Sequence, residues 1–147
     1  MLTDVRYRTV IIEPLVGVGD VRLGAESAAV ERELGKPDAV AYFEEDDETE
    51  WSYPQRGLSV GFNAHGAPHV VSITVNNPEA TLFGERVIGA PEQDFMAAMR
   101  AKGIPVELTD WSNDDGSAKF FVLSGVQVFV ATEFGRVSAI ICENTAT

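Results

Sequence analysis

The 147-residue sequence predicts an α+β fold of two tandem units, each a helix followed by an antiparallel sheet of about four strands, with the helices on one face. A seven-residue phrase occurs twice, at 19–25 and 84–90, with glycine first and sixth, an acid second and alanine last. A helix-like stretch follows each copy. Later glycines recur at one offset, since Gly35 and Gly103, like Gly57 and Gly125, are 68 residues apart. We therefore predict an internal duplication, with units at residues 1–78 and 79–147.

The first unit begins with a strand expected at residues 5–12. A helix is expected at about residues 26–34, where Val30 and Leu34 share one face and Gly35 can end the helix. Alternating apolar side chains and turn-forming residues then indicate further strands at 39–43, 51–53, 58–62 and 70–75.

The second unit repeats this order. Pro91 suits the first turn of a helix, Phe95 and Met99 lie on its apolar side, and Gly103 ends it. Strands are expected at 106–109, 119–123, 126–130 and 137–142. Each unit would then leave one sheet face uncovered after its helix is in place, and the two units could join their edges into one long sheet.

The charge of the chain restricts its partners. The formal net charge is −12, whereas a nucleic-acid-binding protein needs a basic surface that replaces counterions. Anionic membranes would repel the chain as well, and no apolar run reaches the ~20 residues of a membrane span. The acidic surface favours basic protein partners, and solubility alone is the other interpretation.

Cysteine usage bears on the compartment. Cys142 is the only cysteine, so no disulfide can form within the chain. It lies in the apolar run 137–142, which predicts a buried structural thiol and not a nucleophile. With no basic N-terminal segment followed by an apolar run, the sequence predicts a cytoplasmic protein.

The stretch around the first helix resembles a known pattern. Leu23-Gly24-Ala25, followed by Val30, Leu34, Gly35 and Pro37, is similar to the phrase that opens and ends a short helix in the β-lactamase-inhibitor-protein-like superfamily. The inhibitor itself is a tandem of two helix-plus-four-strand units. The resemblance implies that fold, and a protein-binding role across an open sheet face. The chain departs from the pattern at Glu26, where a serine or threonine is usual, and by lacking the inhibitor's disulfides.

Two acidic loops are the candidate binding sites. Six acids occur within seven residues after the strand at 39–43, and a second polar loop falls at the equivalent place in the second unit. A basic partner would relieve the repulsion among these charges and would associate quickly. Trp51 and Trp111 flank the loops and are candidate interface anchors. The predicted partner-binding residues are Glu44, Glu45, Asp46, Asp47, Glu48, Glu50, Trp51, Asp110, Trp111, Asp114 and Asp115. Solvated hairpin tips, and tryptophans that cap the core, are the alternative interpretations.

No catalytic, cofactor or metal site is predicted. The acidic run lacks the alternating ligands and the glycine of a calcium loop. His65 and His69 are four residues apart, but Gly66 and Pro68 between them exclude a helix that would present both to zinc. We therefore predict a non-enzymatic protein-binding module, most specifically an immunity-type inhibitor of a toxin or enzyme. A structural or assembly subunit that dimerises through its sheet edges is the first alternative, and a small-molecule binder or enzyme is the second.

Overall fold

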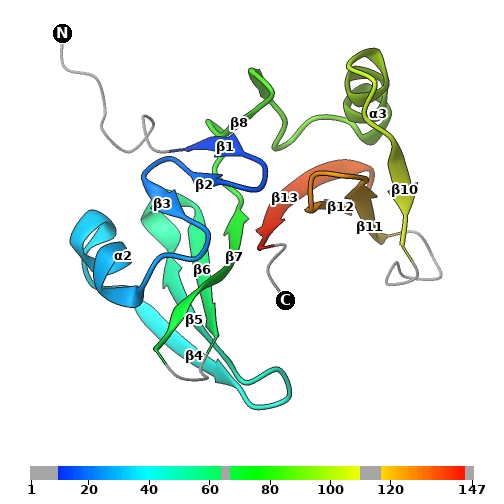
Figure 1. Cartoon of the computed structure of the whole chain (residues 1–147). Coiled ribbons are helices and arrows are strands. Elements are labelled where there is room, and N and C mark those ends of the chain that lie inside the picture. Colours follow the sequence, from blue (N-terminus) through cyan, green and yellow to red (C-terminus); the bar gives the residue numbers. More distant parts are fainter. Residues whose placement is uncertain (1–9, 64–66, 110–116, 145–147) are drawn as a thin grey trace, which may run out of the picture.

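The computed structural model describes residues 10–63, 67–109 and 117–144 (Figure 1). In this part of the chain the protein is mostly β, with two helices and two sheets of five and eight strands. The predicted α+β fold of two tandem helix-plus-sheet units is therefore wrong. The reason is that four short segments where no strand was predicted, at 17–18, 21–22, 81–82 and 85–86, form a second sheet together with residues 11–13. This second sheet covers the large sheet together with the helices.

The large sheet is antiparallel throughout. It runs in the order β10-β11-β12-β13-β7-β6-β5-β4, so that two consecutive four-stranded meanders join where β13 pairs with β7. Its strands are β4 (Ala39–Phe43), β5 (Glu48–Tyr53), β6 (Leu58–Asn63), β7 (His69–Val75), β10 (Val106–Leu108), β11 (Ala118–Leu123), β12 (Val128–Glu133) and β13 (Arg136–Glu143). The short 3₁₀ turn η1 (Pro54–Arg56) connects β5 to β6.

The small sheet has strands of only two or three residues, in the order β3-β2-β1-β8-β9. They are β1 (Ile11–Glu13), β2 (Gly17–Val18), β3 (Val21–Arg22), β8 (Thr81–Leu82) and β9 (Glu85–Arg86). β1 pairs in parallel with β8, about seventy residues later in the chain. The strand predicted at residues 5–12 thus corresponds in part to β1, and residues 5–9 lie outside the described residues.

Each copy of the glycine phrase connects the two sheets. Its early residues form β3 in the first copy and β9 in the second. Its late residues exchange hydrogen bonds with the large sheet, because Gly24 N donates to Val70 O over 2.8 Å and Val70 N donates to Ala25 O over 2.8 Å. In the second copy Gly89, Ala90 and Val137 make the same exchange over 2.7 and 2.9 Å. Each copy therefore precedes a helix and also links the small sheet to the large one. The duplication itself stays a prediction.

The two helices lie on the same side of the large sheet as the small sheet does. They are α2 (Ser27–Leu34) and α3 (Glu92–Ala101), close to the predicted positions. Tyr53 Oη donates to Gly35 O at the end of α2 over 2.9 Å. At the start of α3, Thr132 Oγ1 donates to Glu92 Oε1 over 3.0 Å, and Lys119 Nζ lies 3.3 Å from Glu92 Oε2. Because β strands alternate, these side chains share the inner face of the large sheet with its buried residues.

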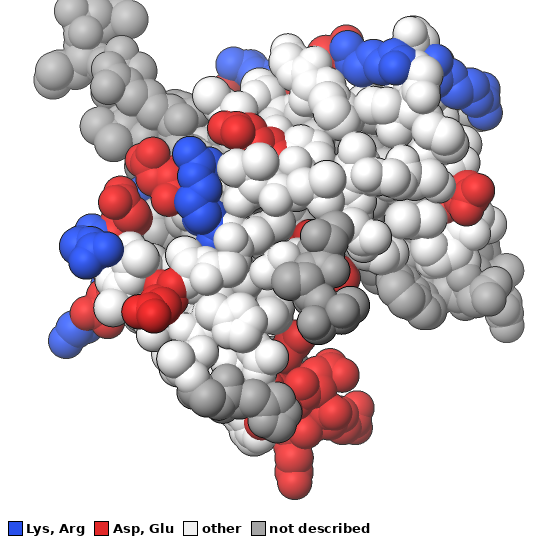
Figure 2. Space-filling view, in the orientation of Figure 1, with Lys and Arg blue, Asp and Glu red and all other residues white. Residues whose placement is uncertain are grey.

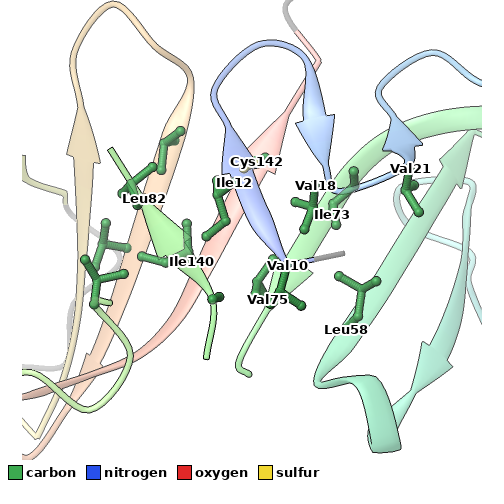
Figure 3. Close-up of a cluster of buried hydrophobic side chains, with 14 of the residues drawn as sticks. Val10, Ile12, Val18, Val21, Leu58, Ile73, Val75, Leu82, Ile140 and Cys142 are labelled. Carbon is green, nitrogen blue, oxygen red and sulfur yellow. The ribbon is translucent and has the colours of Figure 1, made fainter. Parts of the chain in front are cut away.

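The core lies between the two sheets (Figure 3). Ile12, Val18 and Leu82 of the small sheet point toward Ile73 and Ile140 of the large sheet, and all five side chains are buried. From the helices, four side chains complete this core, namely Val30, Leu34, Phe95 and Met99. Burial of this apolar surface is the main favourable contribution to folding. The opposite face of the large sheet carries half-exposed residues such as Ser72, Thr74 and Ile141, and we call it the open face.

Cys142 is part of this core and is fully buried. Burial raises the pKa of its thiol to about 12. The thiolate fraction at pH 8 is then on the order of 10⁻⁴, and the sulfur is inaccessible as well. We expect no reaction of the folded protein with an aromatic disulfide reagent at pH 8, followed by one equivalent of reaction once urea unfolds it. Equal reaction rates with and without urea would contradict the buried position.

Candidate functional site: the acidic β4–β5 hairpin

The acidic run forms the tip of the β4–β5 hairpin. We call Glu44, Glu45, Asp46, Asp47, Glu48 and Glu50 the acidic tip. The first four occupy the turn, and the other two begin β5. Figure 2 shows the carboxylates gathered at the lower end of the molecule, where Figure 1 places this hairpin. Within the described residues, no lysine or arginine forms an ion pair with Glu44, Glu45 or Asp46, which are all exposed.

The turn has a defined conformation. Asp47 adopts a φ of 51°, in the left-handed region that aspartate tolerates better than most residues. Its amide donates to Glu44 O over 3.3 Å, and Tyr42 Oη donates to its Oδ1 over 2.6 Å. The hydrogen bond to Asp47 raises the pKa of Tyr42, and burial and the charge of Asp47 add to this. These hydrogen bonds define the backbone of the turn from which the exposed carboxylates extend.

Glu143 extends the acidic surface from Glu48 and Glu50 over the open face of the large sheet. Burial raises the pKa of Glu48, and the charges of Asp46, Glu143 and Glu50 raise it further. Burial also raises the pKa of Glu143. The register aligns Glu50, Gly61, Ser72 and Glu143 across neighbouring strands, so that these residues lie on one face. Glu143 was not among the predicted site residues, because β13 and β5 are far apart in sequence.

Glu143 gives a testable pH dependence. A carboxyl group whose folded pKa is raised binds its proton more tightly in the folded state, so its stabilising effect is complete at low pH and is lost as pH rises through the folded pKa. We expect Glu143→Gln to raise the free energy of unfolding at pH 7 by about 0.5 kcal/mol and to leave it unchanged at pH 3. Urea titrations at the two pH values measure this. The exposed control Glu133→Gln should show no such difference, and equal effects of the two variants would contradict the argument.

Trp51 lies on the other face of the hairpin from Glu48 and Glu50. Its register partners Val40 and Val60 place it on the inner face, and its ring centroid lies 4.6 Å from that of Phe62 at an interplanar angle of 57°. Trp51 is half-buried against the core. The structure thus places the predicted anchor beside the acidic tip but does not bring it onto the surface that carries Glu48 and Glu50.

β4 itself presents apolar side chains that were not predicted as site residues. All five of its residues are exposed, and the exposed fractions reach 60% at Val40, 57% at Tyr42 and 48% at Phe43. β4 is also the last strand of the large sheet, so only one of its sides is paired. The uncharged run 39–43 before the acids could be seen in the sequence and predicted a strand. That this strand lies at the edge of the sheet follows only from the strand order. Exposed large apolar groups of this kind, adjacent to charged groups, are typical of interaction surfaces.

The other candidates give no second site. Asp110, Trp111, Asp114, Asp115 and His65 lie outside the described residues. Among the described residues, no group of three or more histidine, cysteine, aspartate or glutamate side chains could hold a metal ion. The hollow lined by Asp38, Tyr53, Gln55 and Arg56 measures about 130 Å³, less than the ~300 Å³ at which ligand pockets begin. A larger hollow of about 350 Å³ is lined by residues 42–46 and so belongs to the acidic hairpin itself. Neither helix of the described chain is long and apolar enough to cross a membrane.

Comparison with known proteins shows a similar fold only. No family model matches the chain, and no curated protein matches it. A solved structure of an extracellular protein containing a SCP domain, from Bacillus anthracis, is similar with a TM-score of 0.53 and 10% sequence identity. The match covers 84% of this chain and 44% of that chain. That protein is not a β-lactamase-inhibitor-protein-like structure, so the resemblance in sequence stays a prediction.

Proposed function

We propose that this chain is a non-enzymatic protein-binding module whose acidic hairpin contacts a basic protein partner. In its most specific form the proposal is an immunity-type inhibitor that covers the site of a toxin or enzyme. The partner is a protein and not a nucleic acid or a membrane, because the net charge of −12 opposes both. A cytoplasmic location belongs to the same proposal and rests on the lone cysteine.

The observation that carries the proposal is the coincidence of two surfaces on one hairpin. The exposed acids Glu44, Glu45 and Asp46 follow directly after the exposed apolar side chains of β4. Carboxylates without ion-pair partners attract a basic surface over a distance and increase the rate of association. Apolar groups that become buried supply the affinity that charges at a rim do not. The hairpin offers both contributions at one place.

The first test neutralises the tip. We expect the triple variant Glu44→Gln, Glu45→Gln, Asp46→Asn to capture its partner about tenfold more slowly at 50 mM salt, with the dissociation rate changed by less than about threefold. The partner would be isolated from native lysate with the wild-type chain, beginning with the product of any neighbouring gene. Association and dissociation rates would then be measured by surface-based kinetics at several salt concentrations.

A matched triple variant controls for net charge. Asp20→Asn, Glu26→Gln and Glu33→Gln also remove three exposed carboxylates, but from the region of α2. The control should lower the association rate by less than about twofold. Equal effects of the two triples would show that only the overall charge matters. Recovery of no stoichiometric protein partner would contradict the proposed function as a whole.

A structural or assembly subunit is the second candidate function. The exposed, uncharged edge of β4 favours it, because such an edge can pair with that of another copy. A homodimer through the sheet edges would have twice the 15.9 kDa mass of the chain in light scattering. Two chains of net charge −12 repel each other, and this repulsion disfavours the homodimer. Salt screens the repulsion, so the dimer should become more stable as the salt concentration rises.

A further inference from the structure

The two edges of the large sheet differ in how they are protected. Natural sheets protect their edges with charged side chains, proline, bulges or very short strands. β10 has three residues, with Pro105 before them and Glu107 at their centre. β4 has five residues without charge or proline, and its register with β5 has no shift. In the described part of the chain no strand covers the outer side of β4, which is therefore open to strand addition.

The side chains of β4 differ on its two faces. Val40 and Tyr42 are aligned with Trp51 and Thr49, and so they lie on the inner face. A hollow on that face is lined by Ser27, Thr49, Trp51, Phe62 and Pro68. An added strand would place every second side chain beside this apolar surface. The inner face therefore favours apolar residues at alternate positions.

The open face has a different composition. Ala39 and Ala41 are small, and Ala41 is aligned with Glu50 in β5. Phe43 lies on this face only at the end of β4, where it is aligned with Glu48. Neighbouring strands are about 4.8 Å apart, so a lysine or arginine on an added strand can extend over Ala41 toward Glu50. Beyond the end of β4, Glu44, Glu45 and Asp46 attract the same charges. The open face therefore favours basic residues at the remaining positions.

From this arrangement we propose that the β4 edge accepts an extended segment of the partner as an added strand, with apolar and basic residues in alternation. This inference rests on the proposed function, since it specifies how the partner binds. A second copy of the chain does not match the site, because its own edge carries no basic residue from Ala39 to Phe43. Main-chain hydrogen bonds hold the segment, and the two faces select its side chains.

The test uses a synthetic ten-residue peptide in which lysine alternates with valine, and a control peptide in which glutamate replaces lysine. Binding to the full chain is measured by fluorescence anisotropy, and amide exchange of the chain by NMR. We expect the lysine peptide to bind at least about tenfold more tightly than the glutamate peptide and to slow the exchange of alternate amides in β4.

Two methylated peptides test the main-chain pairing. One carries N-methyl groups on all valines and the other on all lysines, so that the charge and the side chains are unchanged. Alternate amides of a strand point in opposite directions, so one peptide should lose about tenfold in affinity and the other should keep it. The peptide that loses affinity also reports the direction of the added strand. Equal binding of all three lysine peptides overturns strand addition, while leaving the proposed function in place.

A pair of variants tests the apolar side. Val40→Asp adds a negative charge, which would tighten the binding of a basic peptide if charge alone decided it. We expect instead about tenfold weaker binding of the lysine–valine peptide. Leu108→Asp is the matched control on the opposite edge, because Leu108 is 59% exposed and Val40 is 60% exposed. It should change binding by less than about twofold. Unchanged or tighter binding to Val40→Asp overturns the inference, provided that both variants keep the wild-type melting temperature.

Three further outcomes are decisive. No binding of the unmodified lysine–valine peptide overturns the inference. A dimer of the wild-type chain that Val40→Asp disperses in sedimentation would overturn it as well, because a second copy would then occupy the edge. The proposed function fails separately, if the neutralised triple variant captures the partner as quickly as the wild type does.

Discussion

Replacing Phe62 by alanine is expected to lower the free energy of unfolding by about 3–5 kcal/mol. Phe62 is 1% exposed, and its ring packs against that of Trp51. The substitution removes the transfer free energy of the ring and leaves a cavity that the surrounding strands cannot fill. Because domains are stable by only about 5–15 kcal/mol, the variant should be close to the limit of folding. Urea unfolding followed by far-UV circular dichroism measures the loss.

Phe134→Ala provides the control for this prediction. Phe134 is 84% exposed and lies in the turn between β12 and β13, so its removal should change the free energy of unfolding by about 0.5 kcal/mol or less. Tryptophan fluorescence in a Trp111→Phe background, where Trp51 is the only tryptophan, offers a second measurement. The loss of the Phe62 ring should shift the emission of Trp51 to longer wavelength in the folded variant. A loss below about 1 kcal/mol for Phe62→Ala would contradict the position of β6 in the core.

Local patterns predicted the long elements of this fold. Leu58, Val60 and Phe62 alternate in sequence, and all three are buried in β6. The helix predicted at 26–34 is α2, because Val30 and Leu34 share a buried face and Gly35 follows them. Such elements carry enough residues for their periodicity to be visible. Their existence could therefore be predicted without knowledge of the strand order.

The small sheet could not be predicted in this way. Its strands have two or three residues, too few for an alternating pattern, and the pairing of β1 with β8 is a contact between distant segments. In the β8–β9 hairpin, Phe83 and Gly84 both have positive φ, at 52° and 83°. Two such residues in a row form the turn that joins short antiparallel strands. Gly84 was visible in the sequence as the first residue of the repeated phrase, but no strand was predicted on either side of it.

The acidic tip of the candidate site could be predicted from the sequence, but the exposed edge strand beside it could not. The acidic run marked the hairpin tip, since six carboxylates cannot be buried without partners. The face of each side chain depended on where β5 begins, and the predicted strand began at Trp51 whereas β5 begins at Glu48. The edge position of β4 depends on the order of eight strands, which no short stretch of sequence contains. The apolar side chains of the edge were therefore missed.

Gly57→Ala is the second prediction with a large expected effect, and we expect a loss of about 3 kcal/mol. Gly57 has a φ of 60°, where a side chain costs about 1 kcal/mol or more. A β-carbon at this position would lie 2.7 Å from Asn77 Cα and 2.8 Å from Asn77 N, both of which are backbone atoms. The turn cannot move away easily, because Asn76 N donates to Gly57 O and Asn77 Nδ2 donates to Arg56 O, each over 2.9 Å.

The matched control is Gly125→Ala, at the position that the sequence offset pairs with Gly57. Gly125 has a φ of 87°, but no atom lies within 4 Å of an added β-carbon. Only the backbone strain remains, so we expect a loss of about 1 kcal/mol. Urea titrations of the two variants measure the difference. Equal losses would mean that Asn77 moves aside freely. A larger loss for Gly57→Ala would show that the two glycines in matching positions are required for different reasons. Gly125 would be required for its backbone conformation alone, and Gly57 for its conformation and for its close contact with Asn77.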